Sequence, residues 1–437
     1  MPLTRRSLLT GAAALTLSGR ARAASDVEVA VVGAGAAGLA AAAAIRRTGH
    51  SVVVLEARPR IGGRAFTDAA LGPDAAFDAG PQYIHWAERN PWKPIALADG
   101  VRRTDDEAGP WPLVFLDGAP ASDADRLRRR TGFARLSAAL DHPAAADRSI
   151  RDAAGPDDPA MLTAAQGLAR LSLGEEPERV SAADYDQLWS GDDIWVDGYG
   201  ALVTRHYAGL PVRTGMPVSR IDWSGPGVAL DTPGGTLRAA LAIVTVPVGV
   251  LAAEGLRFAP ALPAETAGAI EGLRMGAYTK VGLALDPDRL AGTDLRDAII
   301  VRSGRPGLTA NLEMRPFGRP VAVLHAGGDG ARALCEAGED AAVAAAADEV
   351  AAIFGAKARA ALRGGRLAAW WTDPYARGSY SIAKPGRLSA RAALHRPVAG
   401  RLFFAGEAAA GGGAMTVGGA TLDGQRAARA ALAALGA

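Results

Sequence analysis

The sequence predicts an α/β fold with two domains, one of them assembled from segments that are far apart in the chain. Three observations lead to this prediction. An apolar strand, a glycine-rich turn and an alanine-rich helix follow one another at residues 27–47. Strand and helix patterns then alternate, and an apolar strand followed by a long helix returns near the C-terminus. The length of 437 residues also exceeds what one hydrophobic core usually fills.

The first βαβ unit predicts a Rossmann-like dinucleotide-binding domain. Strand 27–32 runs into the hexapeptide GAGAAG at 33–38, a helix without breakers to Arg47 and a second strand at 51–55 that ends at Glu56. The glycines allow a tight turn that approaches a pyrophosphate at the helix N-terminus, and the acid binds a ribose hydroxyl. A glycine-rich turn alone has other structural uses, but here Glu56 lies 18 residues after Gly38, close to the usual ~20.

The remaining elements are read from apolar periodicity. Residues 78–84 are strand-like, and 87–195 form a polar helical insert. Further strands are expected at 218–223, 227–231, 242–247, 279–285, 298–301, 321–325 and 400–407, and helices at 340–354 and 420–435. We therefore assign 24–86, 196–268 and 372–437 to a discontinuous dinucleotide-binding domain. Residues 87–195 and 269–371 are assigned to an α+β substrate-binding domain with a mixed sheet.

The first 23 residues have the pattern of a signal peptide and are left out of the fold. Arg5 and Arg6 precede a short apolar run, and Ala21-Arg22-Ala23 offers small residues to a signal peptidase. This is the pattern of twin-arginine export, although an Arg pair can also arise by chance. The run is too short to span a bilayer. We expect a periplasmic or secreted protein without a stable membrane anchor.

Composition excludes several functions. Removing the four arginines of the first 23 residues from the net charge of +2 leaves −2, which attracts neither nucleic acid nor anionic lipid. The single Cys335 excludes intramolecular disulfides, and the six histidines show no metal-ligand spacing. We expect no catalytic metal.

The extension of the βαβ unit resembles the FAD-dependent amine oxidase superfamily, which includes monoamine and polyamine oxidases. The segment EARPRIGGR at 56–64 is similar to the part of that family that wraps the FAD pyrophosphate. Later segments resemble the family in the family's order: FDAGPQYIH at 77–85, TVPVGVL at 245–251, YTKV at 278–281, WWTDPY at 370–375, GSYS at 378–381, GE at 406–407 and the stretch 416–426. The resemblance covers nearly the whole chain after the signal segment.

The resemblance implies a bound FAD and a set of residues that contact it. The positions that match the family motifs are Gly33, Gly35, Ala37, Gly38, Glu56, Ala57, Arg58, Gly63, Arg64, Gly80, Gln82, Tyr83, Val218, Trp370, Gly406, Glu407, Thr416 and Val417. Monoamine oxidases carry a second cage tyrosine and a cysteine joined to FAD, where this chain has Thr416 and Ser379. We therefore expect noncovalent FAD and a half-open aromatic cage.

Lys280 is a candidate catalytic residue for two reasons. Only four of the 48 basic residues are lysine, and this one lies in an apolar strand, where an unpaired ammonium is costly. An edge-strand lysine that reaches water is the structural alternative. By resemblance, Lys280 holds a water against the flavin, where it assists proton movement and the reaction with oxygen.

Tyr380 and His85 complete the candidate catalytic set. Tyr380 matches a wall of the family's aromatic cage, although a core or turn aromatic is the plain alternative. His85 matches a position near the substrate amine, where it could help to deprotonate the substrate; a structural histidine is the alternative. Acids that could set polyamine specificity are available in the insert, or form a solvated face: Glu175, Glu176, Asp192 and Asp193.

The expected function is oxidation of the C–N bond of a primary amine, polyamine or amino acid to an imine, with flavin reoxidation by O2 giving hydrogen peroxide. Three alternatives stay open. An FAD-dependent desaturase or porphyrinogen oxidase shares the front motif, a periplasmic amine dehydrogenase would pass electrons to a protein acceptor, and a flavoprotein scaffold would bind flavin without turnover. The chemistry would belong to the cofactor, with position and desolvation supplied by the protein.

Overall fold

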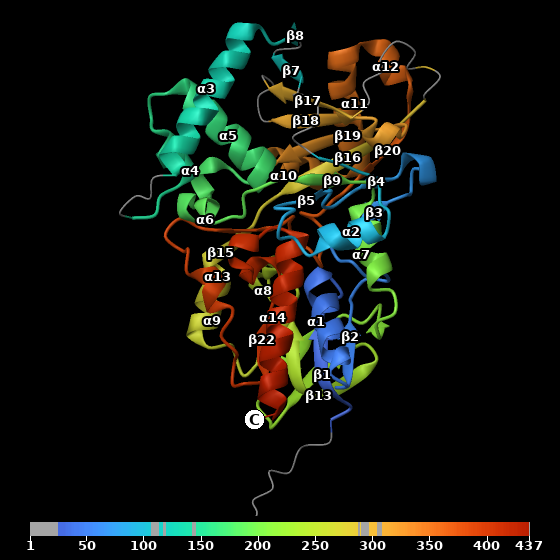
Figure 1. Ribbon diagram of the computed structural model, residues 1–437, viewed down its shortest axis with the longest axis vertical. Coiled ribbons are helices and arrows are strands. Elements are labelled where there is room, and N and C mark those ends of the chain that lie inside the picture. Colours follow the sequence, from blue (N-terminus) through green and yellow to red (C-terminus); the bar gives the residue numbers. More distant parts are fainter. Residues whose placement is uncertain are drawn as a thin grey trace, which may run out of the picture.

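A computed structural model describes residues 25–105, 113–116, 119–141, 146–286, 289, 297–303 and 308–436. The twin-arginine segment therefore lies outside the described residues. Figure 1 shows two halves stacked along the long axis, each built around its own sheet. The α/β fold predicted from the sequence is confirmed, with a mixed sheet in each half and most helices on the faces.

The lower half in Figure 1 contains an eight-stranded sheet with the order β10-β2-β1-β13-β12-β11-β14. Strand β22 pairs with the end of β13, and β10, β2, β1, β13 and β22 are parallel. The strands are β1 (Val27–Val32), β2 (Val52–Leu55), β10 (Val212–Arg213), β11 (Arg220–Asp222), β12 (Val228–Thr232), β13 (Gly235–Val244), β14 (Arg257–Ala259) and β22 (Leu402–Phe404).

Helices α1 (Ala36–Arg47) and α14 (Val417–Gly436) pack against each other beside this sheet, so the two ends of the described chain meet (Figure 1). Small residues make the close approach possible: a Cβ added to Gly424 would lie 2.1 Å from the carbonyl oxygen of Ala37. The other helices of this half are α7 (Tyr199–His206), α8 (Val248–Ala252), α9 (Ala264–Gly272) and α13 (Ala390–Ala393).

The upper half contains a seven-stranded, mostly antiparallel sheet with the order β20-β16-β19-β18-β17-β7-β8. Its strands are β7 (Leu113–Leu116), β8 (Ala119–Pro120), β16 (Tyr278–Leu285), β17 (Ala298–Ser303), β18 (Ala310–Met314), β19 (Val321–Gly327) and β20 (Leu362–Leu367). Helices α10 (Gly328–Ala337), α11 (Glu339–Phe354) and α12 (Ala356–Ala360) lie beside it.

The insert is mainly helical, as predicted, but it also supplies strands. Its helices are α2 (Trp92–Ala98), α3 (Asp123–Leu140), α4 (Ile150–Ala154), α5 (Pro159–Leu173) and α6 (Ala182–Asp186). Three small sheets complete the fold: β3 (Thr67–Asp68) with β4 (Phe77–Asp78), β5 (Tyr83–Ile84) with β9 (Ile194–Val196) and β6 (Arg103–Asp105), and β15 (Leu273–Met275) with β21 (Ser381–Ala383). Short 3-10 turns lie at 73–75, 177–179, 316–318, 407–409 and 411–413.

Three predicted strands differ from the structure, and the one expected at 400–407 is shortened to β22 and followed by the 3-10 turn at 407–409. The stretch 78–84 is not one strand but the separate β4 and β5, because the chain passes so close to Arg64 at Gly80 that an added Cβ would lie 1.9 Å from the Arg64 carbonyl oxygen. The strand expected at 242–247 begins at Gly235, since it forms a hairpin with β12, and ends at Val244. The predicted domain limits remain a prediction.

A buried ion pair connects the insert to the C-terminal segment. Arg391 donates two hydrogen bonds of 2.7 Å to the carboxylate of Asp184, and both side chains are 2 % exposed. Burial alone would raise the pKa of Asp184, but Arg391 outweighs it and lowers the pKa. The stabilisation is therefore complete above the unfolded carboxyl pKa of about 4 and is lost as the pH falls through the lowered folded-state pKa.

We expect Arg391→Met to lower the free energy of unfolding by about 3–5 kcal/mol, because it leaves the Asp184 carboxylate buried without its counter-ion. Arg396→Met is the matched control: its partner is Glu265 and both side chains are exposed, so a loss within about 1 kcal/mol is expected. Urea unfolding of both variants at neutral pH measures the difference, and equal losses would contradict the assignment.

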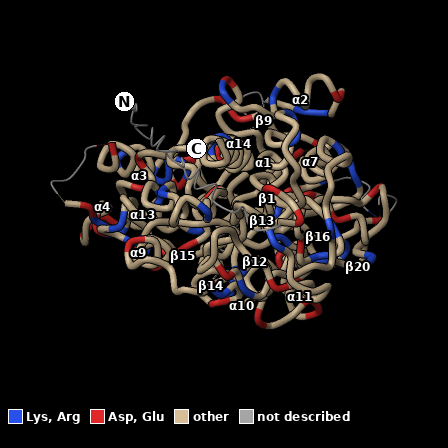
Figure 2. Tube along the Cα trace, turned by 90° about the horizontal axis from the view of Figure 1, so that it is seen from below, with Lys and Arg blue, Asp and Glu red and all other residues tan. Residues whose placement is uncertain are grey.

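Figure 2 shows Lys and Arg interspersed with Asp and Glu along the chain trace. Within the described residues no helix is long and apolar enough to cross a bilayer. The same part of the chain contains no cluster of three or more His, Cys, Asp or Glu side chains placed to hold a metal ion.

Candidate active site

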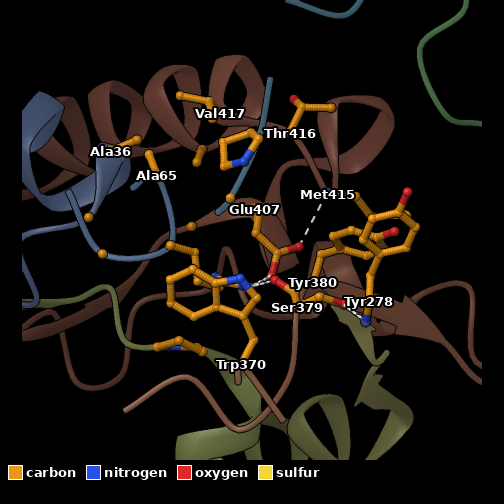
Figure 3. A pocket seen from close by; sticks show the side chains of 18 of the residues that line it. Ala36, Ala65, Tyr278, Trp370, Ser379, Tyr380, Glu407, Met415, Thr416 and Val417 are labelled. Atoms are coloured by element: carbon orange, nitrogen blue, oxygen red, sulfur yellow. Dashed lines mark hydrogen bonds and ion pairs between the residues drawn. The ribbon is translucent and has the colours of Figure 1, made fainter. Parts of the chain in front are cut away.

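A cavity of about 690 Å³ joins the glycine-rich turn of the first sheet to the face of the second sheet. This size is within the range of ligand and cofactor sites. Of the predicted site residues, all three catalytic candidates and every cofactor-binding candidate except Gly38 line it. Figure 3 shows part of the lining, with Trp370, Glu407, Tyr380 and Thr416 contributed by separate segments. The fold thus brings together residues that are up to several hundred positions apart in the sequence.

In the glycine-rich turn, Gly35 borders open space, whereas the position of Gly38 has no room for a side chain. Gly33 has φ +102°, in the region that favours glycine. A Cβ added to Gly35 would meet no protein atom within 4 Å, whereas one at Gly38 would lie 2.0 Å from the Gly33 carbonyl oxygen. Gly35 therefore keeps the cavity open, and Gly38 instead allows the helix to pack closely on the turn.

The start of α1 suits an anion. No side chain caps this helix and its first turn contains no acid, so the positive end of its dipole and its amide groups face the cavity beside Gly35. At the end of β2, the Glu56 carboxylate accepts hydrogen bonds from the backbone N–H of Ala34 (2.7 Å) and of Arg58 (2.8 Å). These bonds hold the carboxylate at the cavity wall, where a ribose would lie if a dinucleotide pyrophosphate occupied the turn.

Glu407 holds the C-terminal segment in place. Its buried carboxylate pairs with Arg64 at 3.0 Å and accepts from the Ser381 hydroxyl at 2.7 Å. Arg64 also donates to the Ser379 carbonyl oxygen at 2.7 Å. Burial would raise the pKa of Glu407, but Arg64 and Arg391 outweigh it and lower the pKa. The carboxylate is therefore ionised, and its role in this structure is to bind protein groups around the cavity.

Lys280 is buried, 4 % exposed, and its Nζ donates to the backbone carbonyl of Asp78 at 2.9 Å and to the side-chain oxygen of Gln82. Burial lowers the pKa of Lys280, while the charges of Glu313 and Asp78 oppose that shift. The lysine does not reach bulk water, so the edge-strand alternative is wrong. An ammonium with a lowered pKa that lines a cavity can exchange a proton with a bound molecule.

Aromatic side chains enclose the cavity. Trp370 is buried and donates its indole N–H to the Ala79 carbonyl at 2.8 Å. The rings of Tyr380 and Tyr278 lie side by side with centroids 6.1 Å apart (Figure 3), and the Tyr380 hydroxyl donates to the Ser172 carbonyl. Burial raises the pKa of both phenols. Tyr278 is thus a second tyrosine in the cavity lining beside Tyr380, and the sequence did not single it out.

Three further cavity residues were also missed: Asn311, Glu313 and His325. His325 on β19 lies directly opposite Lys280 on β16, and Asn311 on β18 lies directly opposite His325. The sequence does contain a signal for these residues. Polar residues stand two positions apart at 278 and 280, and again at 311 and 313, and alternate residues share one face of a strand. Sequence alone does not say which strands are neighbours.

His85 lies at the cavity mouth. Its Nδ1 is 2.8 Å from the Asp193 carboxylate, which also accepts from the backbone N–H of Trp86. The His85 side chain is 44 % exposed and that of Asp193 is 31 % exposed, and both line the cavity. Asp193 is therefore the acid of the insert that reaches the site.

The other acids of the insert do not reach it, and two of them do not form the solvated face that was the alternative. Glu175 is fully buried and pairs with three arginines, Arg332, Arg274 and Arg179. Glu176 pairs with Arg170 at 2.8 Å. Acids that are surrounded by arginine have a structural role, because their charge is already neutralised. Only Asp192 is exposed.

Comparisons with known proteins agree with this geometry. The chain matches the family described as "Flavin containing amine oxidoreductase" over residues 102–432, and the one described as "NAD(P)-binding Rossmann-like domain" over 31–95. It is 29 % identical to Polyamine oxidase 4 of Oryza sativa subsp. japonica over 92 % of this chain and 88 % of that protein. It is 29 % identical to Lysine-specific histone demethylase 1 homolog 1 of the same plant over 91 % of this chain, and spans about half (51 %) of that protein.

Solved structures share the fold. Cyclohexylamine oxidase from Brevibacterium oxydans IH-35A superimposes with a TM-score of 0.76 at 23 % identity, over 94 % of this chain and 100 % of that one. Putrescine oxidase bound to putrescine gives a TM-score of 0.74 at 21 % identity, over 93 % of this chain and 99 % of that one. The fold of this chain is therefore the fold of these solved structures.

Proposed function

The chain belongs to the family of flavin-containing amine oxidoreductases, and from this premise we propose that it oxidises the C–N bond of a small amine that carries no carboxylate. The observation that carries the proposal is the single cavity in which the dinucleotide turn, the buried Lys280 and the paired rings of Tyr278 and Tyr380 meet. The similarity to polyamine oxidases supports the substrate class.

FAD is the cofactor of this enzyme class, and the residues present fit it. The open space at Gly35, the uncapped start of α1 and the carboxylate of Glu56 suit the pyrophosphate and ribose. Cys335, the only cysteine, is buried in α10 and does not line the cavity, so binding does not involve a thioether. When bound, FAD supplies the electron acceptor for the oxidation.

The charges along the cavity favour an amine over an amino acid. An α-carboxylate needs an available guanidinium or a similar cation. The two arginines that line the described cavity are engaged, Arg58 with Asp373 at 2.8 Å and Arg64 with Glu407. Four carboxylates line it as well, those of Glu56, Asp193, Glu313 and Glu407, and the Lys280 ammonium that lines it is already bonded to Asp78 and Gln82. This charge pattern attracts an ammonium and repels a carboxylate.

The protein contributes orientation, desolvation and proton handling. Apolar residues make part of the cavity wall and reduce the contact of a bound molecule with water: Leu171, Leu173, Leu188, Trp189 and Ile299. An amine must lose its proton before oxidation, which near pH 7 costs about 4 kcal/mol for a pKa near 10. A dry pocket supplies part of this, because it disfavours the charged ammonium. The rings of Tyr278 and Tyr380 orient the amine nitrogen.

We further propose that O2 is the final acceptor and is reduced to hydrogen peroxide, with Lys280 as the adjacent proton donor. A periplasmic dehydrogenase that passes electrons to a protein is the second candidate, and it is favoured by the paired Arg5 and Arg6 at the start of the sequence. We also propose export by the twin-arginine route.

The test is to add amines to the purified flavoprotein without oxygen. Primary amines and diamines are expected to bleach the flavin absorbance. The α-amino acids that differ from them only by a carboxylate are expected to leave the absorbance unchanged. A peroxide assay in air then distinguishes an oxidase from a dehydrogenase. If no amine bleaches the flavin, or if amino acids alone do, the proposed reaction or substrate class is wrong.

A further inference from the structure

We propose that Tyr278, His325 and Glu313 form a proton relay that takes the proton from the substrate ammonium before oxidation. The inference rests on the function proposed above, because it requires an amine that enters the cavity protonated. It adds two buried residues, His325 and Glu313, to the proton handling of the site. They are distinct from His85 at the mouth, and the Gln82 side chain, which accepts from Lys280 and donates to Glu313, links the relay to the lysine.

The strands place the three side chains on one face of the sheet. His325 on β19 lies directly opposite Lys280 on β16. Tyr278 shares the face of Lys280, two positions earlier in the same strand, and Glu313 lies on β18 two positions after Asn311, the residue opposite His325. Residues directly opposite one another in antiparallel strands share a face. This face is one wall of the cavity, because all five residues line it.

The contacts form a continuous row along the wall of the cavity. The Tyr278 hydroxyl oxygen is 3.0 Å from Nδ1 of His325, and Nε2 of His325 is 3.3 Å from a carboxylate oxygen of Glu313. The Nε2–Glu313 contact is an ion-pair distance and not an aligned hydrogen bond, and Nε2 has no hydrogen-bond partner among the described residues. Glu313 and His325 are 5 % and 4 % exposed. The row therefore runs from Tyr278, its less buried end, to the buried Glu313.

The electrostatics set the direction of the relay. Burial lowers the pKa of His325 and the charge of Lys280 adds to that, while Glu313 opposes it, so the imidazole is neutral and able to accept a proton. Burial would raise the pKa of Glu313, but His325 and Lys280 outweigh it and lower the pKa. Burial and the Glu313 charge raise the pKa of Tyr278. The phenol therefore conveys a proton and does not store one.

The charged groups of the other elements packed on β19 are engaged elsewhere. Helices α5 and α10 pack against β19. Their charged side chains pair with partners outside the relay: Arg170 with Glu176, and Asp329 with Arg179 and Arg332. The groups that act on His325 are thus Glu313 and Lys280.

These charges assign the tautomer. With Glu313 ionised, Nε2 of His325 carries its hydrogen toward the carboxylate, and Nδ1 accepts the Tyr278 hydroxyl. The phenol oxygen then keeps its lone pairs for a donor in the cavity, such as a substrate ammonium. The arrangement resembles the logic of a nucleophile, base and orienting acid, but here the first member is a phenol that passes a proton.

The step moves one proton and no electron. An N–H bond of the substrate ammonium breaks as its proton moves to the Tyr278 oxygen. At the same time the Tyr278 O–H bond breaks, and the original phenol proton moves to Nδ1 of His325. The amine becomes neutral, and His325 becomes an imidazolium beside the Glu313 carboxylate. When the product leaves, the two proton transfers run in reverse, from His325 to Tyr278 and from Tyr278 to the cavity.

The test is the pH dependence of anaerobic flavin bleaching by a primary amine. Glutamine at 325 can still bond to Tyr278 but cannot store a proton, so His325→Gln should bleach about 100-fold more slowly than the wild type near pH 7. The rate should recover towards the wild type near pH 10, where free amine is abundant in solution. Tyr278→Phe should show the same profile, and the double variant should be no slower than either single variant.

The control is Tyr380→Phe, which removes the neighbouring hydroxyl that donates to the Ser172 carbonyl outside the relay. Whatever its rate, its pH profile should keep the wild-type shape. Flavin content and thermal unfolding check that each variant is folded, and Tyr278→Phe carries the test if His325→Gln does not fold.

Two outcomes would overturn the relay. One is a bleaching rate of His325→Gln and Tyr278→Phe that equals the wild-type rate near pH 7. A bleaching rate that is lowered by the same factor at every pH counts equally against the relay. The other is a pH-dependent defect in His85→Gln instead, which would place the proton acceptor at the cavity mouth. If the wild type is not bleached by any amine at any pH, the proposed function fails, and this result is distinct from both.

Discussion

Lys280→Met should keep FAD and slow turnover or flavin reoxidation at least about tenfold, a bound set below the roughly 100-fold that a positioned proton donor commonly contributes. Methionine is unbranched and of similar length, so it fills the buried space without the ammonium. The residues of the dinucleotide turn and of the Arg64–Glu407 pair are untouched. The loss therefore falls on proton transfer at the cavity wall, where Nζ now bonds to Asp78 and Gln82.

The measurement combines the flavin spectrum, anaerobic bleaching and the rate of reoxidation in air. The proposed role predicts that reoxidation slows more than bleaching does. Lys357→Met is the matched control, because that lysine is exposed in α12, and it should behave as the wild type. Wild-type kinetics in Lys280→Met would remove the lysine from the catalytic set.

Gly35→Val should abolish FAD retention and leave the fold intact. Gly35 has φ −77° and ψ 179°, a conformation that valine adopts readily, and a Cβ there meets no protein atom within 4 Å. The new side chain would therefore stand in the space that the pyrophosphate needs, beside the N-terminus of α1. The protein should purify colourless, with a thermal unfolding transition close to that of the cofactor-free wild type.

Gly38→Val is the contrasting variant. Its Cβ would lie 2.0 Å from the Gly33 carbonyl and 2.8 Å from the Thr245 hydroxyl, so backbone atoms must shift and the free energy of unfolding should fall. Both variants lose flavin, but only Gly38→Val should also lose cooperative unfolding at the normal temperature. A yellow Gly35→Val protein would show that the turn does not hold the cofactor.

The sequence predicted most of the first half of the fold because its signals are local. The strand before Gly33, the helix after Gly35 and Glu56 follow one another within thirty residues of chain, and their order alone produces a βαβ unit. Tyr278 escaped notice because a tyrosine in a strand is usually part of a core. Its position beside Tyr380 depends on the packing of two segments about one hundred residues apart.

The acids of the insert illustrate the same limit. Glu175, Glu176, Asp192 and Asp193 are equivalent as charges in the sequence. Packing buries Glu175 among arginines and places Asp193 at the cavity mouth beside His85. Burial and neighbours decide whether a carboxylate is neutralised or free to meet a ligand.

By itself the sequence determined the dinucleotide turn, the class of cofactor and the placement of a lysine in an apolar strand, because each follows from the identity and spacing of nearby residues. The tertiary structure alone decided which strands lie side by side, and so which polar groups share the wall of the cavity. Lys280, His325 and Asn311 form one row across three strands. The hydrogen bonds of such a row depend on strand register, which is set by the folding of the whole sheet.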